Sequence, residues 1–215
     1  MLKNVRIWFS KTGAACYISH LDLTRCMSRA LRRAGLPVWY TEGFSPRILM
    51  GFAVPLSLGF ESPRESMDIR LLEELPKEEL LQKLNGALPP DIRAFDVTEP
   101  VESINDIAFA DYRMTFSGVP QMAERLRELL AQEKIEVVKH SKKGPKPVDI
   151  RPFFADAFLK ETGDDSCELC CVLPAGNNGG INPMLLAEAL KNAGCAPRVH
   201  VERRALLDGN RELFR

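Results

Sequence analysis

Residues 4–10 have the sequence NVRIWFS, and residues 19–35 have the sequence SHLDLTRCMSRALRRAG. Every second residue in the middle of the first stretch is apolar, which is the period of a half-buried strand. The second stretch opens on Ser19, a residue type that caps helix N-termini, and ends on Gly35, a residue type that stops helices. These signals predict a strand followed by a helix over residues 19–34.

The same order of elements is predicted twice along the chain. After the first strand and helix, the first half is expected to hold extended segments at 38–40, 48–58 and 65–72, a helix at 76–87 and a strand at 91–97. The second half is expected to hold strands at 112–116, 135–139, 167–173 and 198–205 and helices at 120–132 and 183–193. Two successive β-α-β-β-α-β units predict an α+β fold of two tandem ferredoxin-like domains, residues 1–106 and 107–215. The alternative is a single α+β domain with a mixed sheet.

The composition is that of an ordinary soluble globular protein. Hydrophobic residues make up 45% and charged residues 27% of the 215 residues, which excludes disordered and fibrous proteins. The N-terminal residues lack the apolar core of a signal peptide, and no segment approaches the run of about 20 apolar residues that a membrane helix needs. Six cysteines are too few for a disulfide scaffold. We therefore expect a cytoplasmic protein with no membrane partner.

Charge is unevenly distributed along a chain whose formal net charge is zero. Residues 1–50 carry eight basic and two acidic residues, a net charge of +6, whereas residues 61–107 carry twelve acidic and five basic residues, a net charge of −7. The overall balance argues against a histone-like binder. The distribution predicts a surface with separate basic and acidic parts.

The predicted helix carries a stripe of four arginines. At about 100° per residue, their side chains lie within about 100° of one another and opposite the apolar face. They are Arg25, Arg29, Arg32 and Arg33. Guanidinium groups bind phosphates in a bidentate fashion, so the stripe is a candidate track for a nucleic-acid backbone or an acidic protein surface. The simpler interpretation is a solvated helix face, which is the more common outcome.

A second basic segment follows the strand expected at 135–139. Four lysines with no acid between them lie in the segment from Lys139 to Pro147. Such a loop suits an electrostatic arm for RNA, although a solvated hairpin loop explains it equally well. The candidate contacts are Lys142, Lys143, Lys146 and Arg151, together with Arg47 from the first half.

Two further features are candidates for chemistry. His20, in the first turn of the predicted helix, is a candidate general base beside a bound phosphate, and a histidine that packs or caps the helix start is the simpler interpretation. Cys167, Cys170 and Cys171 are candidate metal ligands, but in a strand Cys170 faces away from the other two. We expect buried thiols at these positions rather than a metal site.

Several separated motifs carry a family resemblance. They are Ser19-His-Leu-Asp-Leu, Arg25 with Arg29-Ala-Leu-Arg-Arg-Ala-Gly-Leu-Pro37, Tyr40-Thr-Glu-Gly-Phe-Ser-Pro46, Phe52-Ala-Val-Pro-Leu-Ser-Leu-Gly59, Glu65 with Asp68, and Val148-Asp-Ile-Arg-Pro152. In this order they resemble the bacterial radical SAM-linked protein family, whose members are encoded beside, or fused to, an uncharacterised radical S-adenosylmethionine protein. The positions that carry the resemblance most closely are Ser19, His20, Asp22, Gly43, Phe44, Pro46, Glu65, Asp68, Asp149 and Arg151.

The resemblance implies a partner that supplies the [4Fe-4S] cluster and S-adenosylmethionine. The chain lacks the C-x3-C-x2-C triplet of such enzymes, because position 174 is proline where a third cysteine would follow Cys171. It also departs from the family at Ser45-Pro-Arg47, where Asn-Pro-His-Pro is common. Arg47 would therefore have to provide the phosphate or carboxylate contact there.

The sequence leads to three functional hypotheses. The first is a non-catalytic accessory protein that presents RNA, of the tRNA or rRNA kind, to a radical SAM partner. The second is a metal-independent endoribonuclease with His20 as general base. A fainter resemblance to CRISPR repeat-processing endoribonucleases, which also have an early histidine-bearing helix, supports RNA contact more than cleavage. The third is a pure protein-interaction module whose basic face meets an acidic surface of the partner.

Overall fold

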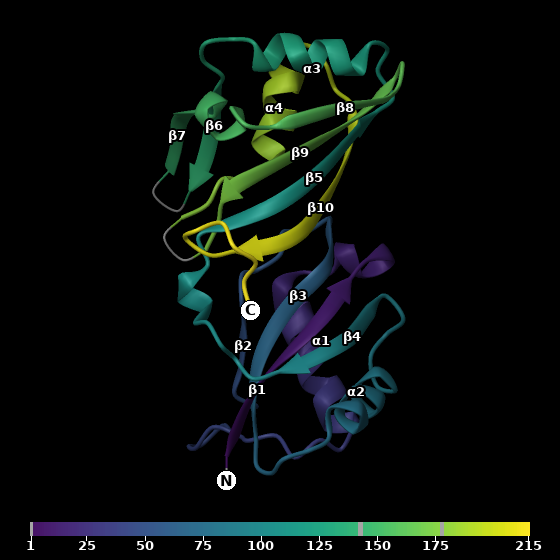
Figure 1. The fold of residues 1–215 in the computed structure, drawn as a ribbon, viewed down its shortest axis with the longest axis vertical. Coiled ribbons are helices and arrows are strands. Elements are labelled where there is room, and N and C mark those ends of the chain that lie inside the picture. The colour runs from purple at the N-terminus through teal and green to yellow at the C-terminus, as the bar shows by residue number, and fades with distance from the viewer. Residues whose placement is uncertain (1, 142–143, 177–178) are drawn as a thin grey trace.

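The computed structural model describes residues 2–141, 144–176 and 179–215, with four α-helices among them (Figure 1). The helices are α1 (His20–Arg33), α2 (Lys77–Asn85), α3 (Met122–Leu130) and α4 (Met184–Asn192). The strands are β1 (Lys3–Lys11), β2 (Met50–Phe52), β3 (Phe60–Leu71), β4 (Ile92–Thr98), β5 (Phe109–Ser117), β6 (Glu136–Ser141), β7 (Gly144–Asp149), β8 (Phe158–Gly163), β9 (Ser166–Pro174) and β10 (Arg198–Leu207). The short 3-10 helices are η1 (Gly13–Tyr17), η2 (Ile104–Asp106) and η3 (Arg151–Phe154).

Most strands belong to one large mixed sheet. Its order is β4-β1-β3-β10-β5-β9-β8, with β2 paired to β3 outside this path. The two halves of the chain meet where β3 and β10 run parallel, through the pairs Val201↔Phe60 and Glu202↔Glu61. The other pairs in this sheet are antiparallel. In Figure 1 the two halves lie one above the other along the long axis, and this α+β arrangement agrees with the predicted class.

The first half forms its core between the sheet and two helices. The expected helix at 19–34 is confirmed as α1, and the Ser19 side chain caps it by accepting a hydrogen bond from the Asp22 N–H at 3.1 Å. Because its apolar residues recur every three or four positions, α1 buries one face. That face packs with α2 and with alternate residues of β1 and β3. The arginine-bearing face is thereby left to solvent.

The second half forms a separate and larger core between its strands and α3 and α4. Strand β5 buries every second residue from Ala110 to Phe116, and β9 does the same from Cys167 to Leu173. This core also takes in Trp8 and Phe60 from the first half. The two halves therefore share apolar packing as well as a strand pair.

The strand bounds of the first half differ from the prediction. The segment expected to be extended over 48–58 holds only the three residues of β2, whereas β3 begins at Phe60 instead of 65. Pro63 obscured the early part of β3, because proline inside a strand normally argues against it. Here the β1–β3 register shifts between Phe9 and Lys11, and proline is tolerated at such an irregularity.

The basic segment after residue 139 is a correction to the prediction. It was expected to be a loop, but its described residues extend β6 and form β7, which pair as a hairpin apart from the large sheet. The sequence of β7 begins Gly-Pro-Lys-Pro, and its glycine and prolines are typical of a turn, so a loop was predicted there. The place beside β9 is taken instead by β8, a strand that was not predicted.

Candidate functional site

The four predicted arginines of α1 all lie exposed on the same helix. The Arg25 side chain forms an ion pair with Asp22 at 3.2 Å, and the Arg33 guanidinium donates to the Ala87 carbonyl at 2.7 Å. The Arg32 guanidinium lies 5.8 Å from the centre of the Tyr40 ring. Arg29 has no polar partner among the described residues. Arg29 and Arg32 are thus the two guanidinium groups of this face with neither a hydrogen bond nor an ion pair in the described part of the chain.

Arg47 lies in an exposed loop next to the end of α1. The loop spans residues 41–47 and is closed by two backbone hydrogen bonds, Thr41 N–H to the Arg47 carbonyl at 2.7 Å and Leu49 N–H to the Trp39 carbonyl at 3.2 Å. Tyr40, which Arg32 contacts, stands at its base. This contact brings the loop of Arg47 beside the arginine face.

Three family-motif positions lie in the same loop. They are Gly43, Phe44 and Pro46, all exposed. Gly43 has a φ of 120°, which only glycine adopts readily, and Phe44 is fully exposed. The loop therefore presents an aromatic ring to solvent near the arginines.

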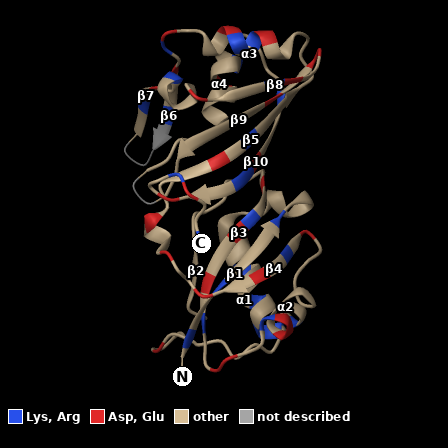
Figure 2. Ribbon diagram, in the orientation of Figure 1, with Lys and Arg blue, Asp and Glu red and all other residues tan. Residues whose placement is uncertain are grey.

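The second group of predicted basic contacts lies in the other half of the molecule. Lys142 and Lys143 fall outside the described residues. Lys146 is on β7, and Arg151 follows Asp149, whose carboxylate accepts the Arg151 N–H at 3.0 Å and the Ile135 N–H at 2.9 Å. The hairpin β6–β7 and the helix α1 lie in different halves (Figure 1). The described members of the second group, Lys146 and Arg151, thus lie in the other half from the α1 arginines, and Figure 2 shows basic and acidic positions in both halves.

His20 packs against the sheet at the start of α1. Its ring meets Phe52 edge-on at 5.1 Å between ring centres, and its Nδ1 is buried with no hydrogen-bond partner among the described residues. Burial lowers the pKa of His20, and the nearby Glu65 carboxylate opposes this shift. The packing of the ring is what the simpler interpretation of His20 expects.

The cysteines of β9 point to opposite sides of the sheet. Cys167 and Cys171 are buried in the core, and Cys170 is half-buried on the other face. Burial raises the pKa of Cys167 to about 11 and that of Cys171 to about 12, so both are thiols at neutral pH. Among the described residues, no group of three or more His, Cys, Asp or Glu is placed to hold a metal ion.

The family-motif residue Glu65 is one half of a buried ion pair between the two halves of the chain. Arg203 on β10 donates through Nε and Nη2 to its two carboxylate oxygens at 3.0 and 2.6 Å, and through Nη2 to the Val54 carbonyl at 2.6 Å. Arg203 is only 1% exposed. Burial opposes its charge, but the carboxylate overcomes this effect and the pKa of Arg203 is raised.

Asp68 makes a similar bond with Arg6 on β1. The Arg6 guanidinium donates to both carboxylate oxygens at 2.7 and 2.8 Å and to the backbone carbonyls of Glu102 and Arg215. It also lies 4.3 Å from the centre of the Phe214 ring. The last residues of the chain are thereby held against the first strand.

Both carboxylates are at family-motif positions, but the two arginines that hold them were not predicted. Arg6 interrupts an apolar stretch in the first strand, and Arg203 lies within the last predicted strand. A charged residue inside a strand with a buried pattern could have predicted these ion pairs, since buried charges are almost always paired. Which acid pairs with which arginine depends on the sheet order.

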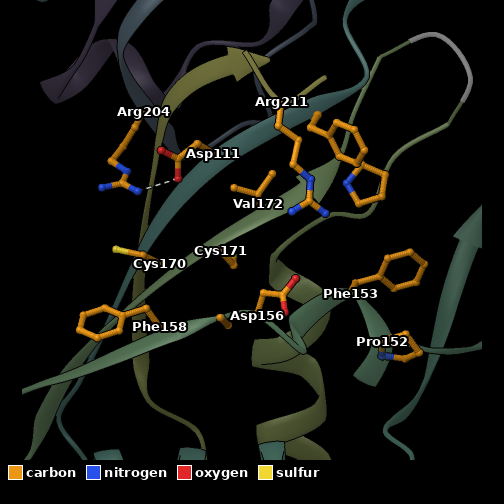
Figure 3. A pocket seen from close by; sticks show the side chains of 13 residues that line it. Asp111, Pro152, Phe153, Asp156, Phe158, Cys170, Cys171, Val172, Arg204 and Arg211 are labelled. Carbon is orange, nitrogen blue, oxygen red and sulfur yellow. Dashed lines mark hydrogen bonds and ion pairs between the residues drawn. The ribbon is translucent and has the colours of Figure 1, made fainter. Parts of the chain in front are cut away.

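A pocket lies on the open face of the second half, opposite the buried residues of β5 and β9. Its volume is about 410 Å³. Figure 3 shows the side chains that line it, among them Asp111 and Arg204, which form an ion pair at 2.7 Å. None of the predicted site residues except Cys170 and Cys171 lines this pocket.

No helix in the described part of the chain is both long enough and apolar enough to span a bilayer.

Comparisons with known proteins place the chain in a family without assigning it an activity. None of the curated proteins compared with it matches. A crystal structure of an unknown protein from Galdieria sulphuraria is similar at 10% identity and a TM-score of 0.28, over 94% of this chain and 99% of that chain. A family model described as "Uncharacterized protein conserved in bacteria (DUF2344)" matches residues 4–183, from β1 through β9. The chain therefore belongs to the DUF2344 family.

Proposed function

We propose that the chain is a non-catalytic accessory protein that binds RNA through the exposed face of α1. Arg29 and Arg32 carry the proposal, because both are exposed on one face and neither makes a hydrogen bond or an ion pair in the described part of the chain. An unpaired guanidinium keeps its donors free for phosphate oxygens. The exposed ring of Phe44 in the neighbouring loop adds a surface on which an unpaired base can stack.

RNA binding should depend on salt and on these two arginines. Binding of a tRNA transcript and of an rRNA fragment is measured by filter retention at several salt concentrations. Each phosphate contact of a single strand contributes a log-log slope of about −0.7. The Arg29→Glu/Arg32→Glu variant should bind more weakly by at least about tenfold and with a shallower slope.

A matched control separates the arginine face from charge in general. Lys160 and Lys191 are exposed, lie in the second half and have no ion-pair partner among the described residues. The Lys160→Glu/Lys191→Glu variant has the same change in net charge and should retain RNA affinity. Equal losses in both variants, or binding that does not respond to salt, would contradict the proposal.

We further propose that the chain works with a separate radical SAM protein. The sequence motifs around His20, Glu65 and Asp149 support this proposal through the family resemblance, and the partner would carry the [4Fe-4S] cluster and S-adenosylmethionine. Pull-down of the tagged chain from its native cells should recover that protein. Recovery that is lost in the Arg29→Glu/Arg32→Glu variant but resists nuclease would instead support a pure protein-interaction module.

The same RNA experiment tests the endoribonuclease hypothesis. Cleavage products that disappear with His20→Ala, while binding is kept, would replace the accessory role by a catalytic one. RNA that is bound and left intact supports the proposal as stated.

We also propose that each half is a ferredoxin-like unit, residues 1–106 and 107–215. The strand order supports this assignment, because β4-β1-β3-β2 in the first half corresponds to β10-β5-β9-β8 in the second. In this view the β6–β7 hairpin is an insertion between α3 and β8. Separate expression of residues 107–215 would test whether the second unit folds alone.

A further inference from the structure

The pocket on the open face of the second half has the size of a small-ligand site. Its volume of about 410 Å³ lies within the usual range of roughly 300 to 1,000 Å³ for such pockets. Strands β5, β9 and β10 form its floor, and η3, the start of β8 and the turn after β10 form its sides.

Two opposite charges in this pocket have no polar partner among the described residues. Asp111 and Arg204 neutralise each other, but the side chains of Asp156 and Arg211 make no ion pair or hydrogen bond within the described part of the chain. In Figure 3 the Asp156 carboxylate and the Arg211 guanidinium point into the pocket from opposite sides. A ligand that fills the space would meet an unpaired acceptor on one side and an unpaired cationic donor on the other.

The position of Arg211 is fixed by a tight turn. Its φ is 64°, in the left-handed region that costs a non-glycine residue about 1 kcal/mol. The Asp208 carboxylate holds this turn by accepting the N–H groups of Asn210 at 2.9 Å and Glu212 at 2.8 Å. The Arg211 guanidinium then lies 5.3 Å from the centre of the Phe109 ring, at the edge of the pocket. The turn and the contact with Phe109 thus place the guanidinium at this edge of the pocket.

Aromatic side chains supply flat walls. Phe109 and Phe153 line the pocket, and Phe158 at the start of β8 is 66% exposed beside it. Exposed aromatic rings lose water favourably when a planar group stacks on them. The preferred ligand is thus planar, with an anionic group for Arg211 and hydrogen-bond donors for Asp156.

We propose that this pocket binds a guanine nucleotide. The Watson-Crick edge of guanine presents two adjacent N–H donors, which suit the Asp156 carboxylate, while the ring stacks on the phenylalanines and the phosphate binds Arg211. Adenine presents an acceptor on the same edge, which the carboxylate repels. The shared chemistry is a guanosine monophosphate unit, whether free or part of an RNA strand. The pocket is distinct from the α1 face, so this inference does not rest on RNA binding there.

Cys170 provides a direct readout, because its half-buried thiol lines the pocket. The rate of its alkylation by iodoacetamide is followed by peptide mass spectrometry, with the half-buried Cys26 of α1 as internal control. GMP should slow alkylation of Cys170 but not of Cys26, and AMP at the same concentration should not slow either. Stronger protection by a short guanosine-containing oligonucleotide than by GMP would show that the natural ligand is part of an RNA strand. Stronger protection by GMP would show that it is a free nucleotide.

Two substitutions test the assigned contacts. Asp156→Asn and Arg211→Gln should each weaken GMP binding by about tenfold or more, since each removes a hydrogen bond to a charged group. Arg211→Gln should bring the affinity for GMP close to that for guanosine. Glu133→Gln and Lys191→Gln, exposed and outside the pocket, are the matched controls.

Three results would overturn the proposal. They are a lack of protection by GMP and the oligonucleotide alike, equal protection by AMP, and unchanged GMP affinity in Asp156→Asn. In the Arg29→Glu/Arg32→Glu variant, GMP should slow the alkylation of Cys170 as much as in the unaltered protein. Failure of this proposal is therefore distinguishable from failure of RNA binding by α1.

Discussion

Glu65 and Arg203 are oppositely charged residues with almost no exposure to solvent, at 5% and 1%. A buried charge that loses its partner keeps its desolvation penalty, which costs about 3 to 5 kcal/mol. Glu65→Gln should lower the free energy of unfolding by about this amount, as measured by urea denaturation. The exposed Glu133→Gln should change it by less than about 0.5 kcal/mol. Similar values for the two variants would show that the ion pair contributes little.

The partly buried ring of His20 should make the protein sensitive to acid. Burial lowers the pKa of folded His20 below its ordinary value of 6.5, so below that pH the unfolded chain binds more protons than the folded one. Stability should then fall as the pH drops from 6.5 to the lowered folded value. In His20→Gln this part of the pH dependence should disappear. Urea unfolding at a series of pH values checks this, and an unchanged slope in the variant would contradict it.

At the scale of elements, the N-terminus of α1 depends on a single side chain. Ser19 accepts the Asp22 N–H, one of four backbone donors that a helix start leaves without a partner. Ser19→Ala should destabilise the protein by about 1 kcal/mol, whereas Ser19→Asn, which can cap in the same way, should have little effect. Chemical denaturation of both variants gives the measurement. Equal destabilisation would assign the role of Ser19 to something other than capping.

For the whole molecule, Phe214 links the two halves. It is 1% exposed, meets Trp8 edge-on at 6.1 Å and belongs to the core of the second half. Phe214→Ala should cost about 3 to 5 kcal/mol, and because the cores adjoin we expect one cooperative transition.

Tryptophan fluorescence and circular dichroism provide two probes of that transition. Both tryptophans, Trp8 and Trp39, lie in the first half. The fluorescence and far-ultraviolet midpoints should therefore move together in Phe214→Ala. A fluorescence midpoint that stays in place would show that the halves unfold independently.

Local sequence patterns predicted the features that depend only on residues close together in the chain. The helix at 19–34, its cap at Ser19 and the alternation of β9 all appear as expected, because capping and periodic burial are set within a few residues. The exposure of the four α1 arginines follows from the same periodicity. The prolines of β3 and β7 misled this kind of reasoning, since their tolerance depends on the pairing partner.

Local patterns in the chain are enough to predict the α+β class, the α1 helix with its arginine face, and the orientation of Cys170 opposite to that of Cys167 and Cys171. The pairing of Glu65 with Arg203 and of Asp68 with Arg6 depends instead on the folded arrangement of the strands. The same arrangement makes Asp156 and Arg211 face one pocket. These residues are distant in the chain, so their contacts follow from the strand order and the register of a sheet. Those features are fixed by the packing of whole elements, which no local pattern records.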